Sequence, residues 1–423
     1  MRVSASNAMT PMNGDPVSPR TGYPIPDRDC FFEWLPPEPG QPGETPFTKF
    51  WTTRDELLWP FYQARGETRV FDFSSANLYR KYGEGYYAKF ADMSHRRLRS
   101  WCVNTMSSSS DSAICNLRRT PYYDRVERLS RFIEGSANFW FKFRDPWDPT
   151  FRTSVLEALA KRGGQGHDPM CIGFSIDNEI NWGATPSQLA EWTLRSPADQ
   201  PAKAALVEFM KKRYGDVAKL NAEWKSAYTD WDDLLHTLTP PGVAAHKDLA
   251  DFTSVIVEEY FKRTRAAVKE FDPQLLYLGC RFAGVGSARP WVIGHCAKYS
   301  DVVTYNIYNW GVKDFRLPEG VEDKPVLVTE FHFGSTDRGP FGASLRPTAN
   351  QEDRAEKIRG YVRSAIANPQ IAGVHWHQYS DQATTGRFDG ESSQVGWTDV
   401  CDTPYPETIK ALREVGGEIY ANR

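Results

Sequence analysis

Two glutamates are the residues of this chain whose surroundings most favour catalysis. Glu179 ends the run Cys171-Ile-Gly-Phe-Ser-Ile-Asp-Asn-Glu179, and Glu330 ends the run Pro325-Val-Leu-Val-Thr-Glu330. Because a short apolar run bounded by turn-forming residues predicts a buried strand, each carboxylate is expected at a strand end, on the rim of a sheet. Two carboxylates on opposite sides of a pocket are the groups that hydrolyse glycosidic bonds.

The segments that must position these glutamates alternate between short apolar runs and longer amphipathic ones. The predicted strands are residues 101–106, 138–143, 171–179, 275–282, 302–308, 326–333 and 373–379. The helices predicted between them are residues 202–220, 252–271 and 352–367. A further helical period runs from Asn77, the expected N-cap, to residue 100. This repeat predicts an α/β protein with a parallel sheet, and its length favours a (β/α)8 TIM barrel.

A (β/α)8 barrel needs one more strand than these runs supply, and that strand must lie upstream of Trp101. The candidates are residues 2–5 and residues 69–73. If the first strand is residues 2–5, the chain begins inside it, as expected of an N-terminally truncated protein. Residues 1–68, with many Pro and Gly, predict an irregular segment packed on the barrel, and residues 69–423 predict the catalytic barrel of what is effectively a single domain.

In this strand order, Glu179 ends the fourth strand and Glu330 ends the seventh. The two carboxylates then face each other across the C-terminal mouth of the barrel, where barrel enzymes hold their active sites. On the fourth strand, the small or polar residues that share the parity of Glu179 are expected to line the interior; they are Gly173, Ser175 and Asp177. A single glutamate at a strand end is more often a surface charge or a helix cap, whereas two at related positions favour a catalytic pair.

The bulk composition excludes several classes of partner. With 51 basic and 54 acidic residues and a formal charge of -3, the chain has no basic field for nucleic acid or for a membrane surface. A neutral or weakly charged substrate is expected, and the 14 Trp and 19 Tyr can supply flat platforms for sugars or pack in the core. The seven scattered cysteines have no metal-binding spacing and predict mostly buried thiols.

The start of the chain and its apolar runs bear on its compartment. The first residues lack the apolar core of a signal peptide, and no run is long enough for a membrane span, so a cytoplasmic protein is expected from the sequence as written. A truncated N-terminus would instead allow a periplasmic or secreted protein. A homo-oligomer is compatible with all of these features.

Several longer motifs resemble a known family. They are Asp177-Asn-Glu-Ile-Asn-Trp-Gly183, Arg213-Tyr-Gly215, Leu220-Asn-Ala-Glu-Trp224, Leu278-Gly-Cys-Arg-Phe282, Glu330-Phe-His-Phe-Gly-Ser-Thr-Asp-Arg-Gly339, His375-Trp-His-Gln-Tyr-Ser-Asp-Gln382, Gly386-Arg-Phe-Asp-Gly-Glu391 and Asp399-Val-Cys-Asp-Thr-Pro-Tyr-Pro-Glu407. The order Asn-Glu after the fourth strand and Glu after the seventh resembles clan A glycoside hydrolases, whose members are retaining. The long motifs closely resemble the β-agarases of glycoside hydrolase family 50, over about residues 30–423.

This resemblance implies a retaining glycoside hydrolase that cleaves β-galactosidic linkages in agar-type galactans or their oligosaccharides. It further implies exo action, no cofactor, Glu179 as the acid/base and Glu330 as the nucleophile. The sequence departs from the family in lacking a counterpart of its N-terminal β-rich domain, and in residues 102–111, 335–336 and 340–344. Because such loops shape the sugar-binding subsites, the chemistry is expected to transfer better than the substrate.

Substrate-binding side chains are expected around the catalytic pair. They are Asn178, Trp182, Arg281, Tyr308, His332, His375, Trp376, Asp381, Gln382, Arg387 and Glu391. The Asn178 amide can bind a sugar hydroxyl or cap the turn after the strand. Arg281 can keep Glu330 ionised or form a structural ion pair. Clan relatives hold an aromatic hydroxyl beside the nucleophile at the position of Tyr308, which can otherwise pack at the rim.

The remaining candidates leave alternatives open. His332, His375 and His377 could form a zinc site with an open position, but retaining hydrolysis needs no metal, so sugar-hydroxyl donors or core histidines are favoured and no metal is expected. Trp376 can stack on the cleaved sugar or pack in the core. The polar residues after the last strand can bind sugar hydroxyls or remain solvated.

The predicted mechanism is double displacement by the two glutamates. It requires carboxyl groups about 5 to 5.5 Å apart and a raised pKa for Glu179. One alternative is a β-galactosidase or exo-hydrolase that acts on another galactan, such as carrageenan or porphyran oligosaccharides. An alternative from another class is a catalytically inactive barrel that binds carbohydrate.

Overall fold

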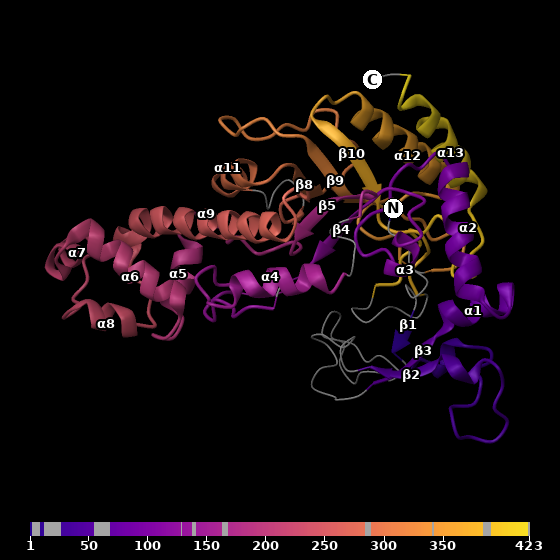
Figure 1. Ribbon diagram of the computed structural model, residues 1–423, viewed down its shortest axis with the longest axis horizontal. Coiled ribbons are helices and arrows are strands. Elements are labelled where there is room, and N and C mark those ends of the chain that lie inside the picture. The colour runs from indigo at the N-terminus through magenta and orange to yellow at the C-terminus, as the bar shows by residue number, and fades with distance from the viewer. Residues whose placement is uncertain are drawn as a thin grey trace.

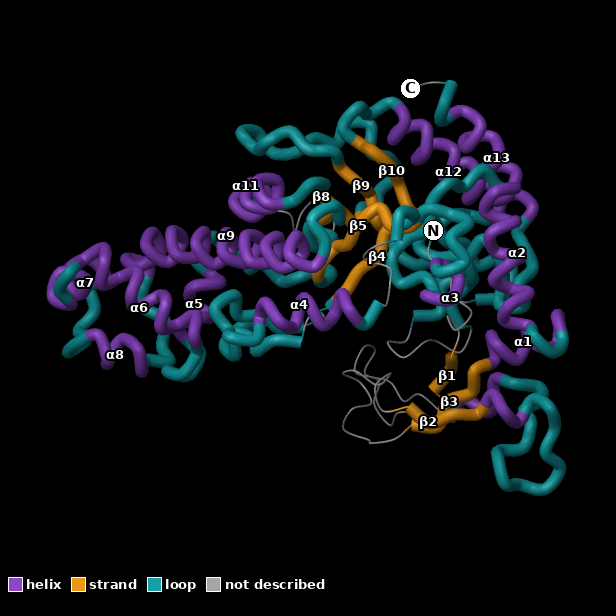
Figure 2. Tube along the Cα trace, viewed as in Figure 1, coloured by secondary structure: helices purple, strands orange, loops and turns teal. Residues whose placement is uncertain are grey.

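The computed structural model describes residues 1, 9–11, 27–54, 68–127, 129–137, 141–162, 168–283, 289–340, 342–383 and 391–421. Parallel strands lie at its centre, and helices cover them on the outside (Figure 1, Figure 2). The α/β class with parallel strands that the sequence predicts is therefore confirmed. No helix in these described ranges is both long and apolar enough to cross a membrane.

Two parallel sheets contain the strands that end near the glutamates. The first has the order β4-β5-β6, with bounds Tyr122–Val126, Cys171–Ile176 and Leu276–Tyr277. The second has the order β10-β9-β8-β7, with bounds Ile371–Trp376, Val326–Phe331, Val303–Asn306 and Phe282–Ala283. Between β6 and β7 the chain still pairs with β5, since the Ile176 N–H donates to the Gly279 carbonyl over 2.9 Å. The two sheets therefore adjoin along residues 276–283.

Helices bury the outer faces of these sheets. They are α4 (Phe151–Ala160), α9 (His246–Phe271), α11 (Pro290–Tyr299), α12 (Gln351–Ile366) and α13 (Pro406–Glu418). α9 packs against α4 and α11, while α12 packs against β10 and α13. β8 and β9 are buried almost throughout, as expected of parallel strands that helices cover.

A helical insertion follows β5 and extends away from the sheets (Figure 1). It contains α5 (Gln188–Leu194), α6 (Pro201–Tyr214), α7 (Val217–Trp224), α8 (Trp231–His236) and the short η6 (Val243–Ala245). The helix predicted at 202–220 is two helices, because Gly215 has a φ of 70° and the Asp216 side chain caps α7. Buried Asp248 of α9 joins this insertion to the body by accepting from the Trp224 indole over 2.7 Å.

The N-terminal part contains a separate antiparallel sheet of order β1-β3-β2, with bounds Met9–Pro11, Thr68–Asp72 and Trp51–Arg54. The short helices η1 (Arg28–Phe31) and η2 (Thr48–Phe50) precede β2. The prediction of residues 69–73 as the first barrel strand was wrong, because this strand pairs antiparallel with β1 and β2. The other candidate, residues 2–5, lies outside the described residues. The division into residues 1–68 and 69–423 stays a prediction.

The helix predicted from Asn77 to residue 100 is also two helices, α1 (Phe73–Tyr82) and α2 (Tyr86–Ser100). Asp72, and not Asn77, is the N-cap, and its side chain accepts from the Ser75 N–H over 2.9 Å. Gly83 and Gly85, with φ of 68° and 71°, end one helix and begin the next.

Two predicted strands were misplaced. Within residues 101–106, Trp101 belongs to the end of α2, because its N–H donates to the Arg97 carbonyl, and only Met106 pairs, as a parallel bridge with Tyr122. Of residues 138–143, the last three form no strand, and the first three lie outside the described residues. The strand of this region is β4, which the sequence analysis missed because its apolar residues are interrupted by Asp124 and Arg125. The short α3 (Ser112–Cys115) lies between Met106 and β4.

The strand pairings among the described residues form two parallel sheets and do not by themselves complete a ring. The (β/α)8 barrel therefore stays a prediction. The ends of β5 and β9 nevertheless bring the two glutamates to one edge of these sheets.

Candidate active site

Glu330 is the fifth residue of β9, and the packing of its neighbour decides which way it points. The ring of Phe331 stacks on Tyr361 of α12, with ring centroids 4.1 Å apart. Because successive side chains of a strand point to opposite faces, Glu330 points away from the helices and into the site. Its side chain is only 16% exposed, so its charge requires partners.

Two side chains from neighbouring segments supply those partners. The Arg281 guanidinium forms a short hydrogen-bonded ion pair with Oε1 of Glu330 and is itself only 2% exposed. The Tyr308 hydroxyl, two residues beyond β8, donates to Oε2 over 2.6 Å. The structure thus brings together Glu330, Arg281 and Tyr308 as the sequence motifs predict.

The electrostatics of this group favour an ionised Glu330. Burial alone would raise the pKa of this carboxyl group, but Arg281, His377 and the Tyr308 hydroxyl together lower it far below the usual range. Burial and the charge of Glu330 raise the pKa of Tyr308 well above its usual value, so the phenol keeps its proton and remains a donor. A carboxylate held in this way can act as a nucleophile at any physiological pH.

Arg281 reaches Glu330 because the chain bends between β6 and β7. Gly279 and Arg281 have positive φ angles of 67° and 53°, which is why the strand predicted at 275–282 is broken in two. The Arg281 N–H donates to the Thr304 hydroxyl oxygen over 3.0 Å, and the Arg281 carbonyl accepts from the Glu179 N–H over 3.1 Å. The same residue therefore contacts both glutamates, one through its side chain and one through its backbone.

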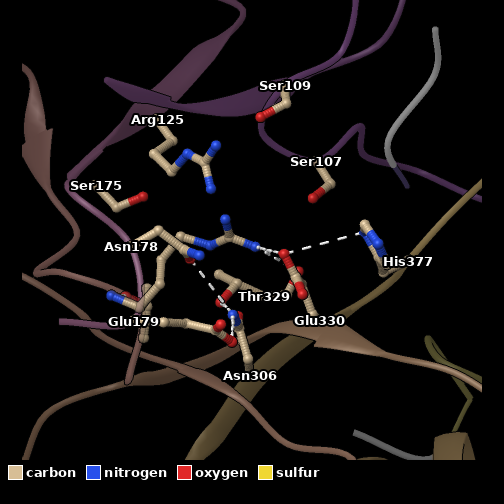
Figure 3. Close-up of polar contacts among 12 residues, drawn as sticks. Ser107, Ser109, Arg125, Ser175, Asn178, Glu179, Asn306, Thr329, Glu330 and His377 are labelled. Carbon is tan, nitrogen blue, oxygen red and sulfur yellow. Dashed lines mark hydrogen bonds and ion pairs between the residues drawn. The ribbon is translucent and has the colours of Figure 1, made fainter. Parts of the chain in front are cut away.

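Glu179 lies beyond the end of β5, where the backbone leaves the strand conformation. Asp177 and Glu179 have φ angles of 64° and 50°, so side-chain alternation stops at Ile176. The prediction that Asp177 lines the interior was wrong for this reason, since its carboxylate accepts from the Tyr260 hydroxyl of α9 over 2.9 Å. The Glu179 carboxyl group is oriented toward the site, where its Oε1 accepts from the Asn306 amide over 2.7 Å (Figure 3).

Asn306 is a site residue that the sequence analysis missed. It is the last residue of β8, it is fully buried, and its amide also lies 3.4 Å from the Asn178 side-chain oxygen. Its own oxygen accepts from the Thr329 hydroxyl over 2.7 Å. A polar residue inside the strand predicted at 302–308 was the available signal, because a buried amide needs partners.

Arg125 is a second missed residue, located on β4. It points toward the centre of the site in Figure 3, and its charge contributes to the lowered pKa of Glu330. It also pairs with Glu127 over 3.2 Å. Ser107, Ser109, Ser175 and Thr329 lie around the same centre (Figure 3). Because the sequence analysis placed a strand at 138–143 and did not predict β4, it could not predict on which face of β4 the Arg125 side chain lies.

Two of the three histidines lie beside the glutamates. His377 approaches Glu330, with Nδ1 4.0 Å from Oε1. His332 has both ring nitrogens engaged, Nδ1 with the His377 carbonyl at 2.9 Å and Nε2 with the Ser344 hydroxyl at 2.7 Å. His375 lies in the core, where its Nε2 is 3.0 Å from the Thr105 hydroxyl and burial lowers its pKa well below the usual value. The described residues contain no cluster of three or more potential metal ligands.

Other predicted binding residues lie in the core. Trp182 is 3% exposed and stacks on Phe261, and Trp376 is 2% exposed and donates from its indole to the Val395 carbonyl. Asp381 is fully buried and accepts from the Gly396 N–H and the Tyr405 hydroxyl, and its burial raises its pKa to about 7. Their direct contact with a substrate stays a prediction.

The last predicted residues follow β10. Gln382 is fully buried, donates to Glu391 over 2.7 Å and accepts from the Ser393 N–H over 2.8 Å. Arg387 lies outside the described residues. Asn178 is half-buried next to Glu179 and lines a cavity of about 30 Å³ with it. Glu127 lines this cavity and also a larger one of about 370 Å³ that Arg125 lines.

Comparisons with known proteins agree with this arrangement. No family model matches the sequence. Beta-agarase B of Vibrio sp. (strain JT0107) is 32% identical over 423 residues, which covers 94% of this chain and 42% of that protein. Beta-agarase A of the same strain is 32% identical over 358 residues, which covers 78% of this chain and 36% of that protein.

Solved structures give the same result. An exo-beta-agarase superposes with a TM-score of 0.87 and 29% identity, which covers 100% of this chain and 62% of that one. The agarase AgWH50C superposes with a TM-score of 0.86 and 28% identity, and PfGH50B with 0.85 and 28%. The chain thus spans less than half of each beta-agarase and about three fifths of these structures. On this combined similarity of sequence and structure, the chain is a β-agarase-like protein of glycoside hydrolase family 50.

Proposed function

We propose that this protein is a retaining glycoside hydrolase that cleaves β-galactosidic linkages in agar-type galactans or their oligosaccharides. The observation that supports this most is that two carboxyl groups at one site have hydrogen-bonding partners of different charge. Glu330 is paired with Arg281 and the Tyr308 hydroxyl, whereas Glu179 accepts from the neutral amide of Asn306. A pair with one permanently ionised member and one member able to exchange a proton is what double displacement needs.

In the first step, a Glu330 oxygen attacks the anomeric carbon of the galactose. The bond from that carbon to the leaving oxygen breaks, and Glu179 gives its proton to this oxygen, so the product is a glycosyl ester on Glu330 and an ionised Glu179. The Tyr308 hydroxyl and Arg281 hold the attacking carboxylate in place.

In the second step, the ionised Glu179 takes a proton from a water molecule as its oxygen attacks the anomeric carbon. The ester bond breaks, Glu330 leaves as a carboxylate, and Glu179 is protonated again. Arg281 and Tyr308 stabilise the departing negative charge. Two displacements at one carbon retain its configuration.

We further propose that the two parallel sheets belong to a (β/α)8 barrel. Three contacts support closure between β4 and β10. The Ser107 N–H donates to the Met1 carbonyl over 2.7 Å, Met106 bridges to Tyr122, and the Thr105 hydroxyl lies 3.0 Å from His375 at the end of β10. In this arrangement Glu179 and Glu330 end the fourth and seventh strands.

The substrate and the exo mode are proposed from the relatives. The proteins that match are named beta-agarases, and one of the solved structures is an exo-beta-agarase. The near-neutral charge of the chain agrees with a neutral galactan. Asn178, Arg125, His332 and His377 surround the glutamates and are the side chains that we propose contact the sugar.

The test is to incubate the purified protein with agarose, neoagaro-oligosaccharides, carrageenan and porphyran oligosaccharides and an aryl β-galactoside, in parallel with Glu179→Ala and Glu330→Ala. We expect turnover of agar-type substrates by the wild type, with NMR showing the β-anomer as the first product. A first product of α configuration would contradict the mechanism. Binding of these sugars without turnover would instead support an inactive carbohydrate-binding barrel.

A further inference from the structure

The amide of Asn306 makes three contacts that no catalytic role has yet explained. Its nitrogen donates to Glu179 over 2.7 Å and lies 3.4 Å from the Asn178 oxygen, while its oxygen accepts from the Thr329 hydroxyl over 2.7 Å. The side chain is fully buried, so no exchange with bulk water competes with these contacts. All four residues lie within one part of the site (Figure 3).

The contacts specify one orientation of this amide. An amide nitrogen has two hydrogens, which suits two acceptor oxygens, and the amide oxygen suits a hydroxyl donor. Rotation of the amide by half a turn would place its oxygen against the oxygens of Glu179 and Asn178, which repel it. Asn306 is therefore a directed donor to the Asn-Glu pair.

The backbone of Asn306 belongs to the Glu330 side of the site. Asn306 pairs with Glu330 between β8 and β9, and the Ile307 N–H donates to the Glu330 carbonyl over 2.9 Å. Thr329, which fixes the amide oxygen, directly precedes Glu330 in the chain. A displacement of Asn306 would therefore change the position of Glu179 relative to Glu330.

We propose that Asn306 is a positioning residue that fixes the Glu179 carboxyl group relative to Glu330 and favours the ionised form of Glu179. This inference rests on the proposed retaining hydrolysis. Asn306 does not touch the reacting atoms; it acts through Glu179. A donor to a carboxylate stabilises the charged form. Asn306 therefore lowers the highest pH at which Glu179 is still protonated and can act as an acid.

Charged and titratable groups on several elements also face Glu179. Arg281 and Tyr308 interact electrostatically with Glu179, and both also bind Glu330. The groups that line the same cavity as Glu179 are Glu127, Lys142, Arg144 and Asp177. None of these groups is itself substituted in an Asn306 variant. A change in the pH profile of an Asn306 variant can therefore be assigned to the amide.

The experiment compares Asn306→Asp, Asn306→Ala and the control Asn309→Ala with the wild type. Asp has nearly the volume of Asn and keeps an acceptor for Thr329, so it retains the fold if Ala does not. Asn309 is an exposed residue of the segment that follows β8 and lies outside the site. For each protein, kcat/KM is measured against pH on a neoagaro-oligosaccharide, and folding is verified by circular dichroism.

We expect the alkaline limb of kcat/KM to move to higher pH in both variants. The shift is about one pH unit or more for Asn306→Asp, because two adjacent carboxyl groups resist double ionisation, and smaller for Asn306→Ala, which only loses a donor. Displacement of the acid lowers kcat by about 10- to 100-fold on the oligosaccharide. Asn309→Ala should match the wild type.

A second measurement separates positioning from a general structural defect. Aryl glycosides of the same sugar with para-nitrophenol and with phenol as leaving groups are compared, because para-nitrophenol leaves without protonation. We expect the loss in the Asn306 variants to be much smaller with para-nitrophenol. Equal losses for both leaving groups, or an unmoved alkaline limb in folded Asn306→Asp, would overturn the inference while leaving the proposed function intact. An inactive wild type would overturn both.

Discussion

The Glu330 side and the Glu179 side of the site hold their carboxyl groups by different means. Glu330 is bound by a guanidinium and a phenol, and its pKa is far below the usual range. Glu179 is bound through its backbone to Arg281 and through its side chain to the neutral amide of Asn306. A nucleophile must stay ionised, whereas an acid/base must exchange a proton in each turnover, and a hydrogen bond from a neutral amide is compatible with that exchange.

The largest effect is expected from removal of Glu330, the proposed nucleophile. Glu330→Gln keeps the shape of the side chain but cannot form the glycosyl ester, so we expect kcat to fall by on the order of 10⁴-fold or more on every substrate. The measurement is hydrolysis of both an oligosaccharide and a para-nitrophenyl glycoside. A variant that keeps activity on the activated glycoside would show that Glu330 is not the nucleophile.

Removal of Glu179, the proposed acid/base, should have an effect that depends on the substrate. We expect Glu179→Ala to lose about 10²- to 10⁴-fold in kcat on the oligosaccharide, because the leaving oxygen is no longer protonated. The first step with a para-nitrophenyl glycoside should be nearly unaffected, and added azide should give a glycosyl azide of β configuration. An α-azide would exchange the roles of the two glutamates or contradict retention.

The ion pair is tested by Arg281→Met with Arg281→Lys as its matched control. Loss of the cation removes the main influence that lowers the pKa of Glu330, so this pKa rises and the acid limb of kcat/KM moves to higher pH, by about 1 to 3 units. Lys keeps a charge and should show a smaller shift. If the acid limb of Arg281→Met coincides with that of the wild type, Arg281 has only a structural role.

The smallest effect is expected for Tyr308→Phe, which removes one hydrogen bond to Glu330 and keeps the ring. We expect a loss of about 10- to 100-fold in kcat/KM, since a hydrogen bond to a charged group is worth about 1.5 to 3 kcal/mol. The acid limb should move to higher pH by less than in Arg281→Met. A larger shift than that of the arginine variant would reverse the ranking of the two partners.

The sequence analysis identified residues that a local pattern marks, and it missed residues whose role depends on contacts between distant segments. Glu179 and Glu330 were found because each ends an apolar run, a pattern that a few adjacent residues define. Asn306 and Arg125 were missed because their importance depends on contacts with Glu179 and with the neighbourhood of Glu330, which come from distant segments. Trp376 and Asp381 were selected because their residue types suit sugar binding, and the structure shows that their neighbours bury them. Their contact with a substrate stays a prediction.

The sequence by itself determined the α/β class, the two glutamates and the family resemblance, because strand and helix periods and local motifs are properties of short segments. Only the tertiary structure decided that Arg281 contacts both glutamates, that Asp177 turns toward α9, and that an amide from β8 binds the Glu179 carboxyl group. These outcomes depend on backbone bends at positive φ and on pairings between strands far apart in the chain, which no local pattern specifies.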